Sequence, residues 1–165
     1  MALTYEPIAT YTTTGNVSGI NFTSIPNTYT DLVVSISGIS NGTGNSTIVT
    51  TFNGDGGSNY SGVQMYYRST GTAGANKNTS ETYIAIARAA GINPNDGGRT
   101  LVNVYIFDYA NTNKYKTLLA QMQNMPSAVE VDVGNWRSNA AITSINFGAN
   151  WGIGTVYTLY GIKAA

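Results

Sequence analysis

Clusters of Gly, Asn, Ser and Pro interrupt this chain at intervals of about ten residues, and short apolar runs lie between them. That spacing is typical of β-sandwiches and barrels, because turns need residues that tolerate tight backbone angles. Helices need Ala, Glu, Lys, Gln and Arg on their surfaces, yet charged residues make up only 10% of the sequence. The chain is therefore predicted to be all-β.

Individual segments show the alternation of a strand with one buried face. Val129 to Trp136 alternates three valines with Glu130 and Asp132, which predicts buried valines and solvent-facing carboxylates. Leu101 to Tyr109 is almost continuously apolar, as expected of a central strand. Ser69 to Ser80 has almost no apolar anchor and is predicted to be an exposed loop, which makes it a candidate for assembly.

With 165 residues the chain fits a single domain. We expect an antiparallel β-sandwich, jelly-roll-like, over residues 15–165, preceded at residues 1–14 by an N-terminal arm or an edge strand. Ile92 to Gly98 is predicted to be a loop, because Pro and Gly favour turns. Tyr115 to Gln123 fits either a strand or a helical turn.

The residue types available limit the chemistry. The absence of histidine and cysteine excludes Ser-His-Asp and Cys-His nucleophilic sites and the usual zinc ligand sets. A glycosidase needs only two carboxylates, but the alternation around Glu130 and Asp132 favours a structural role for that pair. The Gly-rich loop from Asn53 to Ser58 lacks the later ligands of a calcium loop, so a hairpin turn is the better interpretation. We expect no enzyme, no cofactor and no metal.

Charge and hydropathy bear on the partners. Eight basic and eight acidic residues give a net charge of zero, and no cluster of Lys or Arg could neutralise several phosphates, so we expect no nucleic acid partner. No basic amphipathic stretch and no long apolar run occur, so we expect no membrane partner. The first residues lack the features of a secretory signal, which predicts synthesis in a cytoplasm.

Isolated aromatic and aliphatic residues are the candidates for partner contacts. Aromatics near loops serve either as core edges or as anchors for partners and sugars, and core packing is the commoner outcome. The N-terminal stretch is polar with single apolar residues, as expected of an arm that adds a strand to a neighbour or of a strand that closes its own sheet. The predicted partner-binding residues are Leu3, Tyr5, Ile8, Tyr11, Tyr66, Tyr67 and Trp151.

Several strings resemble those of one family. They are Ala2-Leu3-Thr4-Tyr5-Glu6-Pro7-Ile8-Ala9, Ser24-Ile25-Pro26, Tyr29-Thr30-Asp31-Leu32, Phe52-Asn53-Gly54-Asp55, Gly57-Ser58-Asn59-Tyr60-Ser61, Tyr115-Lys116-Thr117, Trp136-Arg137-Ser138, Ala141-Ile142-Thr143-Ser144-Ile145 and Thr158-Leu159-Tyr160-Gly161-Ile162-Lys163. With them the chain resembles the small β-rich virion structural proteins of tailed bacteriophages, nearly end to end except for residues 70–98. The resemblance implies a place in a phage particle and no catalytic residue.

This resemblance leads to two functional hypotheses. The first is a capsid decoration or cement protein that is made in the bacterial host cytoplasm and bridges capsid subunits, with the major capsid protein as its partner. The second is a tail-fibre or tail-tip module that binds host surface glycans through loop aromatics and Asn side chains. A low-charge β surface risks edge pairing, so we expect a homo-oligomer, a trimer before a dimer.

Overall fold

The computed structural model describes residues 4–41, 47–87, 99–124 and 128–163. Within these ranges the chain forms twelve strands and no helix, so no described helix is long and apolar enough to cross a membrane. The strands are β1 (Thr4–Thr12), β2 (Val17–Phe22), β3 (Asp31–Gly38), β4 (Ile48–Phe52), β5 (Tyr60–Arg68), β6 (Ala73–Glu81), β7 (Ile84–Ile86), β8 (Thr100–Phe107), β9 (Lys116–Asn124), β10 (Ala128–Trp136), β11 (Ile145–Trp151) and β12 (Val156–Lys163).

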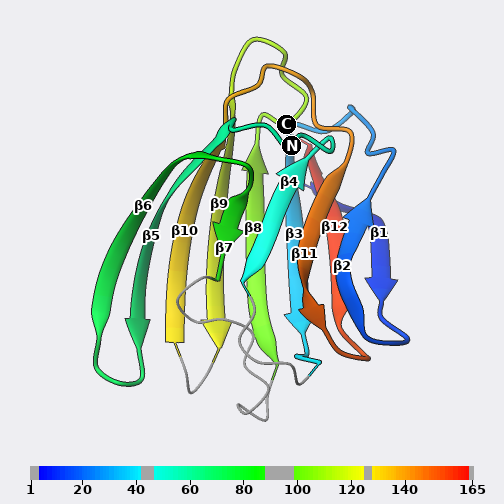
Figure 1. Cartoon of the computed structure of the whole chain (residues 1–165). Coiled ribbons are helices and arrows are strands. Elements are labelled where there is room, and N and C mark those ends of the chain that lie inside the picture. Colours follow the sequence, from blue (N-terminus) through cyan, green and yellow to red (C-terminus); the bar gives the residue numbers. More distant parts are fainter. Residues whose placement is uncertain (1–3, 42–46, 88–98, 125–127, 164–165) are drawn as a thin grey trace.

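The strands make two antiparallel sheets that face each other (Figure 1). The large sheet has the order β1-β12-β3-β8-β9-β10-β5-β6, and the small sheet has the order β2-β11-β4-β7. Strands β1 and β6 are therefore the two margins of the large sheet, and they lie at opposite sides of the molecule in Figure 1. This arrangement confirms the predicted all-β, antiparallel, jelly-roll-like sandwich.

The core fills the space between the two sheets. Every second side chain of a strand points inward, and on β3 these are Leu32, Val34 and Ile36, all nearly inaccessible to solvent. The small sheet supplies large residues such as Phe52 and Phe147 from the opposite side. The outer face of the large sheet, by contrast, has no layer over it among the described residues.

Strand β10 buries the face that its sequence predicts to be exposed to solvent. Val129 and Val133 are 46% and 44% exposed, whereas Glu130 and Asp132 are each 2% exposed, so the prediction of buried valines was wrong. The reason is Trp136, which shares the parity of the carboxylates and packs on core aromatic rings. Burying this indole contributes more free energy than burying the valines, and this difference determines which face of β10 points into the core.

The buried carboxylates have polar partners inside the sandwich. Gln64 on β5 donates a hydrogen bond from its amide to Glu130, and its own carbonyl oxygen accepts one from Asn76 on β6 at 2.8 Å. The backbone N–H of Ala87 donates to Asp132 at 3.1 Å. These contacts offset part of the cost of removing two carboxylates from water.

Two other segments clarify the sequence predictions. Ser69 to Ser80 is not simply a loop, because β6 occupies Ala73–Glu81 and pairs along β5. Backbone pairing at a sheet margin holds this strand without apolar anchors. Tyr115 to Gln123 is largely strand β9 and not a helical turn. The loop predicted at Ile92 to Gly98 lies outside the described residues.

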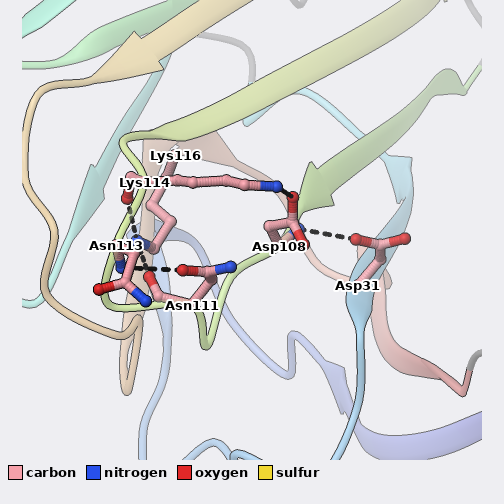
Figure 2. A network of polar contacts seen from close by, with 6 residues as sticks. All are labelled: Asp31, Asp108, Asn111, Asn113, Lys114 and Lys116. Atoms are coloured by element: carbon pink, nitrogen blue, oxygen red, sulfur yellow. Dashed lines mark hydrogen bonds and ion pairs between the residues drawn. The ribbon is translucent and has the colours of Figure 1, made fainter.

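Polar contacts hold the connection between β8 and β9 (Figure 2). Asp31 on β3 accepts a hydrogen bond from the backbone N–H of Asp108 at 2.7 Å, and the Asp108 carboxylate pairs with Lys114 at 2.9 Å. The fully buried Lys116 donates to the backbone carbonyls of Lys114 and Asn111. Burial lowers the pKa of Lys116, and the carbonyl oxygens take the place of water around its ammonium group.

Candidate functional site

The N-terminal strand β1 forms an open margin of the large sheet. It pairs with β12 on one side and with no described strand on the other. A bulge between Pro7 and Ala9 shifts its register, so that Tyr5 lies opposite Ile162 on the outer face and Tyr11 lies opposite the buried Tyr157 on the inner face. Half-exposed tyrosines, at 54% for Tyr5 and 46% for Tyr11, therefore stand on opposite faces of one margin.

Charged and aromatic contacts fix the start of this strand. The ring of Tyr5 meets the ring of Tyr160 edge-on, with 6.2 Å between the centroids. Glu6 pairs with Lys163 at 2.9 Å, and the Lys163 ammonium lies 5.4 Å from the centre of the Tyr29 ring. The hydrogen bond from Lys163 lowers the pKa of Glu6, and the same bond raises the pKa of Lys163. The tyrosines thus project from a strand of defined position.

The backbone of the β1 margin is only partly suited to pairing with another strand. Pro7 has no N–H group, and the adjacent bulge interrupts the regular ladder. Both features limit non-specific pairing of this edge strand with strands of other molecules. The regular stretch from Ala9 to Thr12 remains, and there the outward backbone groups can accept a partner strand.

The structure separates the seven predicted partner residues. Tyr5 and Tyr11 are exposed at the β1 margin, while Ile8 between them points inward and packs against the core. Tyr67 is exposed on the outer face of β5, on the opposite flank of the large sheet. Its neighbour Tyr66 has the opposite parity and covers Gly74 on the inner side. Leu3 lies outside the described residues.

Trp151 cannot contact a partner in this structure. Its side chain is fully buried, and its ring meets Tyr157 edge-on with 5.5 Å between centroids. A side chain at Gly38 would collide with the same ring, which shows how closely the core encloses it. The prediction of a partner-binding Trp151 was therefore wrong, because its position on β11 faces the space between the sheets.

A shallow, open groove crosses the outer face of the large sheet from β8 to β6, with a volume of about 840 Å³. Apolar side chains form much of its wall, and several amide side chains lie among them. The side chains that project into it from the outer face are Met65, Tyr67, Ala73, Ala75, Leu101, Asn103, Gln121, Gln123, Val129 and Val131. Sequence reasoning missed this groove, since its β9 residues belong to the segment whose secondary structure stayed open.

The Gly-rich loop after β4 is a closed polar turn. Both carboxylate oxygens of Asp55 accept hydrogen bonds, one from the backbone N–H of Gly57 at 2.8 Å and the other from the Asn59 amide at 2.9 Å and the Trp136 indole at 2.7 Å. These donors, the indole first, lower the pKa of Asp55. Protein donors thus occupy the positions that a cation would need, which agrees with the interpretation as a turn.

The carboxylates on β10 do not form an accessible acid pair. Glu130 and Asp132 point between the sheets, and the space next to Asp132 measures only about 10 Å³, roughly the room for one water. No sugar ring fits there. Across the described ranges, no three Asp, Glu, His or Cys side chains gather closely enough to hold a metal ion.

Comparison with known proteins finds only weak structural similarity. No protein-family model matches the chain, and no curated protein matches its sequence. Among solved structures, the chain is similar to the alginate lyase Aly36B (10% identity, TM-score 0.34, 99% of this chain and 74% of that one). It is also similar to the A. japonicus fructosyltransferase (11% identity, TM-score 0.37, 99% of this chain and 26% of that one). A third similar structure is the Ruminococcus gnavus IT-sialidase CBM40 (9% identity, TM-score 0.33, 93% of this chain and 90% of that one). Identities and TM-scores this low carry no functional argument.

Proposed function

We propose that this chain is a structural protein of a bacteriophage particle, and specifically a capsid decoration or cement protein that attaches to the major capsid protein. One structural observation carries the proposal: Tyr5 and Tyr11 stand half-exposed on opposite faces of an open sheet margin. The resemblance of the sequence strings to small virion proteins, with no catalytic residue implied, supports the same function.

The β1 margin suits attachment by strand addition. A strand from a neighbouring subunit pairs with the backbone of Ala9 to Thr12, and these hydrogen bonds supply affinity that depends little on side chains. The neighbour's side chains then meet Tyr5 on one face and Tyr11 on the other. Tyrosine is well suited to this role, since it offers a large apolar ring with a polar end.

A protein attached in this way reinforces a shell by linkage. Binding only to the assembled shell stabilises it by about 2.7 kcal/mol per site when the free protein is at a hundredfold excess over its dissociation constant. A copy that contacts two neighbouring subunits gains further through the high effective concentration of the second contact. The homo-oligomer expected from the sequence would multiply these contacts within one assembly.

The experiment measures occupancy of purified particles by the double variant Tyr5→Ser with Tyr11→Ser. We expect occupancy at limiting protein to fall by more than tenfold, because truncation of a tyrosine at an interface hot spot costs about 2 kcal/mol or more. Tyr115→Ser is the matched control, since Tyr115 is equally exposed at 55% but lies immediately before β9, away from the β1 margin. Circular dichroism checks that each variant folds. Full occupancy by a folded double variant would refute the role of this margin.

A further inference from the structure

We infer that the groove on the outer face of the large sheet is a binding site for an uncharged oligosaccharide. The groove lies over β8, β9, β10, β5 and β6, whereas the proposed attachment margin is β1 at the other end of the sheet. The inference therefore concerns a second surface and stands or falls independently of particle attachment.

Three unengaged amides are the first argument. Asn103 on β8 lies directly opposite Gln121 on β9, and Gln123 lies one outward position further along β9, opposite Leu101. All three amide-bearing residues are exposed, and their side chains make no hydrogen bond within the described part of the chain. Each amide offers two N–H donors and a carbonyl acceptor, which matches the mixed donor and acceptor character of sugar hydroxyls.

The polar row continues beyond the groove. Along the same cross-strand line, Ser35 on β3 lies opposite Asn103, and Thr158 on β12 lies opposite Ser35. From β12 to β9 this line spans about 14 Å at the ordinary spacing of strands. A ligand that follows it meets hydroxyl and amide groups in succession, which favours an extended chain of sugars over a compact molecule.

Apolar surface beside the amides is the second argument. Met65, Tyr67, Leu101 and Val129 are each about half exposed and flank the amide positions. Sugar rings combine hydroxyl edges with C–H faces, so they need apolar contacts next to hydrogen-bonding groups. The groove volume of about 840 Å³ falls within the range of small-molecule sites.

The charge of the groove selects the class of glycan. Glu130 is the charged residue among the described ones that line it, and its carboxylate points to the inner side, where Gln64 donates to it. Among the described residues, no Lys or Arg lines the groove, and these are the residues that recognise sulfate, phosphate and carboxylate groups. An uncharged oligosaccharide therefore fits better than an anionic one.

Protein occupants fit the groove less well. A peptide strand would need free backbone groups, but the backbone on the floor of the groove is already paired between neighbouring strands. An apolar face of a second copy would bury the three amides without partners, which costs free energy. Sugar hydroxyls satisfy these amides, and both a capsid-surface position and the tail-tip position considered from the sequence would present such a site to host cells.

The test uses the purified full chain and a printed array of neutral and anionic oligosaccharides, followed by titration calorimetry with the best neutral binder. We expect binding to neutral glycans, and an affinity loss of about fivefold for Gln121→Leu and for Gln123→Leu, the usual net effect of one hydrogen bond. Asn21→Leu is the matched control, because Asn21 is an exposed amide on β2 of the small sheet.

Three results would overturn this assignment. They are the absence of binding to every neutral glycan on the array, a preference for the anionic glycans, and equal affinities for the groove variants and the wild type. Particle occupancy of the same groove variants separates this test from the proposed function. If the groove variants occupy particles normally and bind every glycan with the affinity of the wild type, the groove assignment fails and the proposed function stands.

Discussion

Replacing Asp55 by Ala should destabilise the protein more than a substitution in a surface turn usually does. The substitution removes the acceptor of the Trp136 indole N–H, which lies 2.7 Å from the carboxylate, while Trp136 itself is 2% exposed. A buried donor left without its partner costs about 1–3 kcal/mol. The Asn59 amide and the Gly57 N–H also lose their acceptor, but water can replace it in this exposed turn.

We therefore expect a loss of about 2–3 kcal/mol in the free energy of unfolding, which for a domain of this size lowers the melting temperature by roughly 5–10 °C. Urea and thermal unfolding, followed by tryptophan fluorescence and circular dichroism, measure both quantities. Glu6→Gln is the control, because it breaks only the exposed pair with Lys163 and should leave the free energy of unfolding nearly unchanged.

The dependence on pH gives an independent check of the same contact. Hydrogen bonds lower the pKa of Asp55 in the folded protein, so its contribution to stability is fully present above the unfolded-state pKa of about 3.9. That contribution is lost as the pH falls through the lower folded-state pKa. The stability difference between wild type and Asp55→Ala should be constant near neutral pH and shrink below about pH 4. A variant as stable as wild type, or a difference that does not shrink in acid, would refute the reasoning.

Two further pairs of substitutions test the packing and the orientation of strands. Gly38→Ala should lower stability by about 1–3 kcal/mol, since its Cβ would lie 2.1 Å from a ring atom of Trp151, whereas Gly15→Ala, with no atom within 4 Å, should be nearly neutral in the same urea titration. Val133→Lys should fold with a melting temperature close to that of wild type because Val133 faces outward, while Val34→Lys should not fold, since Val34 is fully buried. Unfolded Val133→Lys protein, or a stable Gly38→Ala variant, would contradict these assignments.

The sequence contains enough information to predict the architecture but not the orientation of every strand. Turn clusters and alternating residues such as Leu32, Val34 and Ile36 indicate strands, because they report on local backbone preference and one buried face. On β10 the alternation is clear, but which of its two faces is buried depends on the aromatic rings that Trp136 packs against. Those partners come from β4 and β5, which are distant in sequence, so the local pattern alone favoured the wrong face.

The residues that form the candidate surfaces could not be grouped from the local sequence pattern either. Tyr11 lies six positions after Tyr5, so strict alternation would place both on one face, and only the bulge after Pro7 sends them to opposite faces. The groove depends on strand order, since Asn103, Gln121 and Met65 become neighbours through the pairing of β8, β9, β10 and β5. Composition indicates many Asn and Gln side chains, but it does not indicate which of them share a face.

Quantitative mass spectrometry of purified phage particles tests the central claim most directly. The account predicts that the chain copurifies with intact particles at a copy number comparable to that of the major capsid protein, and that a folded Tyr5→Ser, Tyr11→Ser variant is depleted from them. A handful of copies per particle would place the chain in the tail. Its absence from washed particles would contradict a structural role in the virion altogether.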